Sequence, residues 1–224
     1  MLKKHNIMNI QNLHQIIFTV GRITPNGVNL LGTCFLLNQN GNYATTAHVT
    51  NNDETNLVVV ISDESSLLNY QDTSNNQIRY FKVKIKSIDP VRDIAILESD
   101  LGVHSSAIIG SCDTVSVGNN LAVVGFPHSN AGRQVLTYQN TNVGAKILIE
   151  TSGIKSKHLV LNIQTRPGQS GSPIFNILNS QIIGMIIGSY VPNTNGGIRI
   201  GNIDPQTLHQ TTHAISAEYI LNMI

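Results

Sequence analysis

The chain has 224 residues, a formal net charge of +1 and only 12% charged residues, so it lacks the basic field that nucleic-acid binding requires. Its length suffices for one domain, or for two small barrels that share a core, without stabilising disulfides. With no tryptophan and 5% aromatic residues, its core is expected to consist mainly of Ile, Val and Leu, which favour strands.

Residues 1–16 are expected to form a helical or extended segment, with a helix from about Met8 to Gln15. Asn, Gln and His interrupt the apolar stretch that a signal peptide needs, so the segment is not a convincing one. The longest apolar run, IIGMIIGSYV, is too short and glycine-broken to span a bilayer. We therefore expect a cytoplasmic protein without membrane contact, and leave secretion as an effector open.

Residues 17–110 contain short apolar runs separated by turn-forming residues, which predicts a first β-barrel. The six predicted strands cover 16–23, 32–37, 43–47, 57–61, 81–88 and 94–97. Polar turn signals such as TPNG and NQNG lie between them.

Residues 111–224 contain a second set of such runs, which predicts a second barrel of the same kind. Its strands are expected at 121–125, 134–138, 141–149, 158–163, 172–176 and 181–187, with a last strand near Ala214. A short helix is expected from about Ser216 to Met223, with Ser216 and Glu218 placed to cap and charge its first turn. The fold class is therefore all-β, with helix only at the ends.

The most distinctive segment is RPGQSGSPIF, which places Ser170 among glycines and small residues. Acyl-transfer chemistry needs a hydroxyl on a tight turn whose backbone N–H groups point at the oxygen that becomes negative. Gly168 and Gly171 permit such a turn. Taken alone, the segment also fits a simple loop that joins two strands.

Two further segments favour the catalytic interpretation. His48, in YATTAHVTNN, follows an alternating apolar run, so its imidazole is offered from a strand end, where a general base is useful. Asp93, in IDPVRDIAIL, precedes a buried strand and is suited to orient an imidazolium. Each residue alone is more often structural, but the order His, Asp, Ser over one globular chain is a known arrangement of the triad.

These three segments, with GTCFLLNQNGNYATTAHV as the longest match, resemble the trypsin-like (chymotrypsin-fold) serine proteases. The bacterial HtrA-type proteases are the most similar, and RPGQSGSPIF also resembles the nucleophile loop of glutamyl endopeptidases. No PDZ domain is seen after this region. The resemblance implies two six-stranded Greek-key barrels with the site in the cleft between them.

The resemblance also implies a role for each matching residue. His48 would be the general base, Asp93 its orienting partner and Ser170 the nucleophile, with the backbone N–H groups of Gly168 and Ser170 as the oxyanion hole. Such a mechanism needs no cofactor and no metal. The spacing of His209 and His213 is metal-like, but the surrounding residues suggest a loop that enters a strand.

Gln169 departs from the digestive proteases, which carry there an aspartate that pairs with the freed N-terminus on activation. We therefore expect no zymogen step of that kind. A cytosolic protease without propeptide control would endanger its host, so an activating partner or a loop rearrangement is a hypothesis. A monomer is the default expectation.

Specificity is expected to depend on the strands beside the nucleophile turn. By resemblance, the residues that line the substrate pocket are Gln164, Ile186, Gly188, His213 and Ala214. The absence of an aspartate at Gln164 argues against Lys or Arg as the residue before the cut. A small or medium apolar residue is favoured, although Gln164 could hydrogen-bond a polar one. His213 either favours an acidic side chain or is a partly buried structural histidine.

The expected partner is thus a protein or peptide substrate. Two alternatives stay open. The chain could be an inactive protease fold that binds peptides by strand addition, or an esterase-type acyl hydrolase with the same nucleophile.

Overall fold

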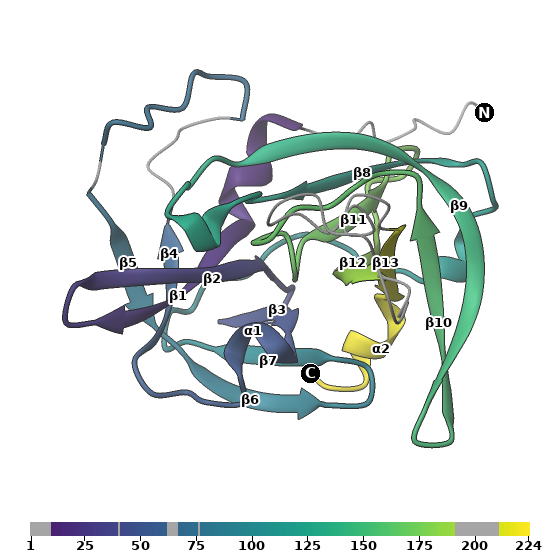
Figure 1. Ribbon diagram of the computed structural model, residues 1–224, viewed down its shortest axis with the longest axis horizontal. Coiled ribbons are helices and arrows are strands. Elements are labelled where there is room, and N and C mark those ends of the chain that lie inside the picture. The colour runs from purple at the N-terminus through teal and green to yellow at the C-terminus, as the bar shows by residue number, and fades with distance from the viewer. Residues whose placement is uncertain (1–9, 40, 62–66, 76, 191–210) are drawn as a thin grey trace, which may run out of the picture.

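The computed structural model describes residues 10–39, 41–61, 67–75, 77–190 and 211–224. Strands are the main secondary structure of these residues and are arranged in two sheets, which confirms the all-β prediction (Figure 1). Within the described ranges, no helix is long and apolar enough to cross a membrane.

The first sheet has seven antiparallel strands in the order β5-β4-β1-β2-β3-β7-β6. Their bounds are β1 Ile17–Thr24, β2 Gly27–Leu36, β3 Asn42–Thr46, β4 Leu57–Ile61, β5 Arg79–Lys82, β6 Lys84–Asp89 and β7 Ile94–Glu98. The sequence predicted six strands here. The difference is the predicted strand 81–88, which the structure divides into β5 and β6.

The division falls at Val83 because the chain changes partners there. Lys82 is paired with Val58 of β4, whereas Lys84 is paired with Glu98 of β7. Val83 itself is buried, and its N–H donates to Leu57 O at 3.2 Å. The single predicted strand 81–88 therefore supplies both edge strands of the sheet, β5 and β6, and connects them directly.

The second sheet is a closed barrel of six strands in the order β10-β13-β12-β11-β8-β9. Their bounds are β8 Asn120–Gly125, β9 Thr137–Thr151, β10 Ile154–Leu161, β11 Pro173–Asn176, β12 Ile182–Tyr190 and β13 Thr211–Ser216. The predicted strands 134–138 and 141–149 form one long strand, β9, which continues into β10 as the hairpin at the right of Figure 1.

A single apolar cluster joins the two sheets. It includes Phe35 and Ile94 from the first sheet, with Phe126, Phe175 and Ile215 from the second part of the chain, all buried. Burying one such side chain contributes roughly 1.5–3 kcal/mol. The two halves are therefore docked through a common core, which fixes the position of any site at their junction.

Short helices lie near both ends. The 3-10 helix η1 covers Ile10–Gln15, within the helix expected from Met8, and the residues before it lie outside the described ranges. The C-terminal helix α2 covers only Glu218–Leu221. The predicted cap at Ser216 is wrong, because Ser216 ends β13 and its Oγ accepts a hydrogen bond from Cys112 N at 3.0 Å.

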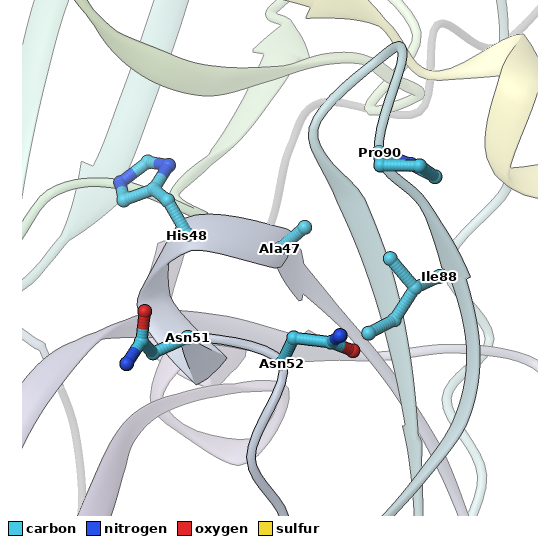
Figure 2. Close-up of a pocket in the computed structure, with 6 residues that line it drawn as sticks. All are labelled: Ala47, His48, Asn51, Asn52, Ile88 and Pro90. Carbon is cyan, nitrogen blue, oxygen red and sulfur yellow. The ribbon is translucent and has the colours of Figure 1, made fainter.

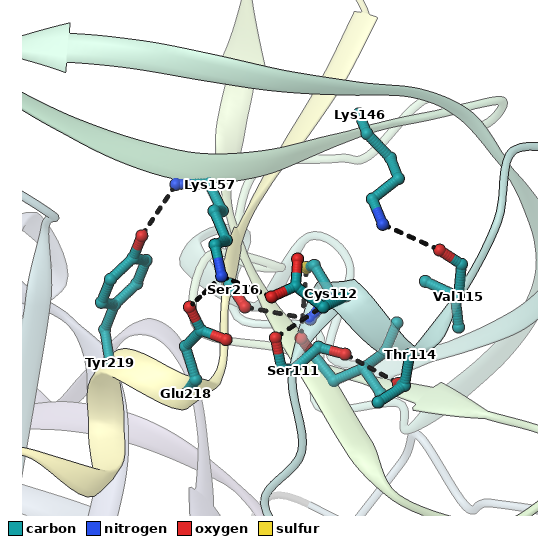
Figure 3. Close-up of polar contacts among 11 residues, drawn as sticks. Ser111, Cys112, Thr114, Val115, Lys146, Lys157, Ser216, Glu218 and Tyr219 are labelled. Atoms are coloured by element: carbon teal, nitrogen blue, oxygen red, sulfur yellow. Dashed lines mark hydrogen bonds and ion pairs between the residues drawn. The ribbon is translucent and has the colours of Figure 1, made fainter.

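Side chains from the second barrel hold α2 instead (Figure 3). Lys157 Nζ lies 3.0 Å from Glu218 Oε1 and 2.5 Å from Asp113 Oδ2. The Lys157 backbone N–H donates to the Tyr219 hydroxyl at 2.9 Å. These contacts anchor α2 to β10 and to the 3-10 helix η2, Cys112–Thr114.

Candidate active site

His48 lies on a one-turn helix, α1 (Ala47–Thr50), that follows β3 directly. The sequence placed it at a strand end, and the structure adds this short turn of helix. The strand β3 is fully buried, so the chain must leave the core at Ala47, where the imidazole reaches the surface with its side chain 48% exposed.

Asp93 is bound to His48 through both of its carboxylate oxygens. His48 Nδ1 lies 2.6 Å from Asp93 Oδ2, and the His48 backbone N–H donates to Asp93 Oδ1 at 2.9 Å. The Asp93 carbonyl also accepts from Ala47 N at 3.1 Å. Together these bonds fix the ring relative to the backbone. They favour the tautomer in which Nδ1–H donates to the carboxylate, which leaves Nε2 available as a base.

Asp93 occupies a left-handed backbone conformation, with φ at 56°. A non-glycine residue in this region costs of order 1–3 kcal/mol, although Asp tolerates it better than most. The conformation places Asp93 immediately before the buried strand β7, which pairs with β3 through Thr46↔Ile94. The sheet therefore presents His48 and Asp93 side by side, although 45 positions separate them in sequence.

A pocket of about 520 Å³ opens beside His48 (Figure 2). It lies between α1 and the end of β6, and its lining residues are Ala47, His48, Asn51, Asn52, Ile88 and Pro90. Its walls are mixed polar and apolar.

Ser170 lies on the turn between β10 and β11, partly exposed. This turn is shaped by Gly168, whose φ is 93°. A Cβ on Gly168 would lie 2.5 Å from Ser129 Oγ and 2.7 Å from Phe126 O, so only glycine fits both the conformation and the space. The Gly171 position is equally restricted, with φ at 87° and the Thr33 carbonyl against it.

The peptide between Pro167 and Gly168 is held by its carbonyl. Pro167 O accepts from His128 N at 2.6 Å, and His128 stands in a left-handed conformation before the 3-10 helix η3, Ser129–Ala131. Because a trans peptide is planar, its N–H points opposite to its C=O. The Gly168 N–H therefore points away from His128, and neither it nor the Ser170 N–H donates to any described residue.

Gln169 is fully buried beneath this turn. Its side chain accepts from Arg166 N at 2.7 Å and donates to Gln139 Oε1 at 2.5 Å. Gln169, which stands where digestive proteases carry an aspartate, is therefore held by neutral hydrogen bonds within the second half of the chain.

Gly32 of β2 connects the two halves of the site. A Cβ at Gly32 would lie 2.6 Å from Val49 Cγ2, on the residue after His48, and 3.1 Å from Ser170 O. The helix that carries His48 and the turn that carries Ser170 therefore rest against the same backbone position. No hydrogen bond joins Ser170 to His48 among the described residues.

The predicted substrate-pocket residues fall into two groups. Ile186 and Ala214 are fully buried and face each other across β12 and β13, and Gly188 is paired with His213 one step further along. Burial lowers the pKa of His213, so its imidazole is neutral at pH 7. Gln164 differs, because it is exposed and its Oε1 accepts from Arg166 Nη1 at 3.0 Å.

The described residues contain no group of three or more His, Cys, Asp or Glu side chains placed to hold a metal. His209 lies outside the described residues. Both cysteines are buried, and burial raises the pKa of the Cys112 thiol to about 11 and that of Cys34 further still. Neither thiol is suited to act as a nucleophile at neutral pH.

Comparison with known proteins assigns the chain to a family. A family model described as "Trypsin-like peptidase domain" matches residues 32–185, which include His48, Asp93 and Ser170. The chain belongs to the trypsin-like peptidase family.

The curated relatives of this trypsin-like chain are HtrA/DegP-like. One, from Rickettsia conorii, is named "Probable periplasmic serine endoprotease DegP-like" and is 27% identical over 201 residues, covering 88% of this chain and 34% of the relative. Another of the same name, from Pseudomonas fulva, is 25% identical and covers 75% of this chain and 30% of its own length. The chain thus spans about a third of the curated relatives it matches.

Solved structures share the fold. The protease domain of MamO from Magnetospirillum magneticum, in its apo form, superposes with a TM-score of 0.67 at 14% identity, covering 95% of this chain and 97% of that one. The HtrA-type protease AlgW, solved with a tripeptide, gives a TM-score of 0.64 at 18% identity, covering 92% and 58%.

Two residues that contact the turn were not identified from the sequence. Thr33 lies within the matched stretch GTCFLL, and His128 follows LAVVGFP, yet neither was singled out. Their contacts with the turn include backbone hydrogen bonds, which leave no signature in side-chain type.

Proposed function

We propose that the protein is a serine endopeptidase in which Ser170 is the nucleophile, His48 the general base and Asp93 its orienting partner. The observation that carries the proposal is the pair of hydrogen bonds between His48 and Asp93, at 2.6 and 2.9 Å. The nearby turn has two backbone N–H groups, those of Gly168 and Ser170, that donate to no described residue. Acyl transfer requires a base that is held in place and free backbone donors near the nucleophile, and these two features meet those requirements.

In this mechanism His48 Nε2 removes the Ser170 hydroxyl proton as Oγ attacks the carbonyl carbon of the substrate. The negative charge on the carbonyl oxygen is stabilised by the N–H groups of Gly168 and Ser170. His48 then gives its proton to the leaving amine, and a water molecule releases the acyl group in a second, equivalent step. The Asp93 carboxylate stabilises the imidazolium through its hydrogen bond with Nδ1.

The test is hydrolysis of an unfolded protein by the purified chain. Ser170→Ala should abolish cleavage, whereas Ser116→Ala, which changes an exposed serine in the second half of the chain, should leave it unchanged. Cleavage that persists in Ser170→Ala would contradict the proposal. Parallel assays on peptide amides and their esters separate a peptidase from an esterase, because an esterase would turn over only the ester.

We further propose a preference for a small or medium apolar residue before the cut. Buried Ile186 and Ala214 support an apolar wall, and the burial that keeps His213 neutral at pH 7 removes the charge that would attract an acidic side chain. A peptide library with each residue type before the cut tests this. Strong cleavage after Lys or Glu would contradict it.

The cytoplasmic location, the monomeric state and the activating partner remain predictions. The hydrolysis assay addresses the partner directly, because full activity of the purified chain without any added factor would remove the need for one. Sedimentation of the same sample measures the oligomeric state.

A further inference from the structure

We infer that Thr33, on the first sheet, is a positioning residue that holds the oxyanion-hole turn of the second barrel in its working conformation. Thr33 lies in β2, and its side chain is fully buried. Its hydroxyl donates to Gly168 O at 2.9 Å and accepts from Phe126 N at 3.2 Å. This inference rests on the proposed function, because it assigns a role in the same reaction.

The backbone of Thr33 is also engaged on both sides. Its N–H donates to Ser170 O at 2.9 Å, and its carbonyl accepts from Thr45 Oγ1 at 2.7 Å. One residue of the first sheet therefore binds the carbonyls of both residues whose N–H groups form the proposed oxyanion hole, Gly168 and Ser170.

These contacts fix the direction of the peptide planes in the turn. Thr33 holds the carbonyl of Gly168, and His128 holds the carbonyl of the preceding residue, Pro167. The Gly168 N–H shares a peptide plane with the Pro167 carbonyl, and the Gly168 carbonyl belongs to the next plane, so rotation of either plane would have to break one of these hydrogen bonds. Without the Thr33 hydroxyl, the Gly168 carbonyl would lose this hydrogen bond, and of the two carbonyls only that of Pro167 would keep its anchor.

Thr33 also sets the distance between the two halves of the site. It follows Gly32, against which Val49 of the His48 helix packs. The pair of residues 32 and 33 therefore contacts the helix that carries the proposed base, the carbonyl of the proposed nucleophile and the oxyanion turn. A shift of this strand would move all three relative to one another.

The chain contains a matched control for the hydroxyl. Thr19 of β1 is directly opposite Thr33 in the sheet register and is equally buried. Its Oγ1 has no hydrogen-bond partner among the described residues. Thr19→Val and Thr33→Val thus remove the same atom from two adjacent buried sites, only one of which is hydrogen-bonded to the turn.

The experiment measures kcat and KM on a peptide amide, together with the Ki of a peptide boronate, which forms a tetrahedral adduct with Ser170. Removing one oxyanion donor outright costs about 10²–10³ in kcat, so disordering the turn in Thr33→Val should lower kcat about 10–100-fold with KM within about twofold. The Ki should rise by the factor by which kcat/KM falls. Thr33→Ser should restore kcat to within about threefold of wild type, and Thr19→Val should match wild type.

A second pair of variants protects the test against misfolding. If Thr33→Val does not fold, Thr33→Ala and Thr33→Ser remove the same methyl group and differ in the hydroxyl, so only Thr33→Ala should lose kcat. Equal kcat in the two variants, or wild-type kcat in folded Thr33→Val, would overturn the inference. An inactive wild type would overturn the proposed function as well, which distinguishes the two failures.

Discussion

The two halves of the site are held by different means. In the first sheet, the position of His48 depends on side-chain chemistry, because both oxygens of the Asp93 carboxylate bind it. In the second barrel, the turn around Ser170 depends on backbone geometry, with positive φ at Gly168 and Gly171 and carbonyls anchored by His128 and Thr33. The first half should therefore be sensitive to changes of functional group, and the second to added volume at its glycines and to loss of the Thr33 hydroxyl.

Asp93→Asn is the most direct test of the first half, because it changes the carboxylate that binds His48. The amide retains the size of the carboxylate and tolerates the left-handed backbone at this position, so the fold should survive. It does not stabilise an imidazolium and favours the wrong tautomer of His48, so kcat should fall about 10⁴-fold. Peptide hydrolysis measured together with the circular dichroism spectrum checks both statements. A fall of less than about tenfold in kcat would contradict the assigned role.

Gly168→Ala tests the second half, because it changes the space and backbone conformation of the turn and leaves every functional group in place. The new Cβ would approach Ser129 Oγ and Phe126 O, which would displace the turn and weaken one oxyanion donor. We expect a loss of about 10²–10³ in kcat. Gly132→Ala is the matched control, since Gly132 also has a positive φ, of 83°, but nothing lies within 4 Å of its Cβ position. Equal losses of activity in the two variants would show that backbone strain alone explains the effect.

The sequence predicted the first half better than the second. His48 and Asp93 are of catalytic residue types and lie beside strongly apolar strands, so pattern and chemistry coincide. The support of the turn comes from the backbone of His128 and from both the backbone and the hydroxyl of Thr33, and neither residue belongs to a catalytic motif in the sequence. The fold class followed from strand periodicity, but the change of partner at Val83 and the single long strand β9 depend on pairing between distant segments, which periodicity does not encode.

The second barrel should also make the stability of the fold depend on pH. Burial lowers the pKa of His158 and His213, both in the second barrel, below the ordinary value of 6.5. The unfolded chain therefore binds protons first as the pH falls below that value, and the folded state loses stability. Urea unfolding at pH 7.5 and pH 5.5 should show a smaller free energy of unfolding at the lower pH.

His158→Gln should reduce this dependence on pH, because it removes one of the two imidazoles whose pKa burial lowers. His104→Gln, at an exposed position, serves as the control and should leave the dependence unchanged. A loss of stability in acid that is identical in wild type and His158→Gln would contradict the assignment to His158. This effect is the smallest of the three, since it concerns stability and not the chemical step.

The most direct measurement is labelling of the native chain with a fluorophosphonate probe, followed by mass-spectrometric location of the adduct. The account predicts one adduct, on Ser170, that is lost in Ser170→Ala and after unfolding and is retained in Ser116→Ala. An adduct on another serine, or no adduct on the folded chain, would contradict the claim that the two halves of the site together activate Ser170.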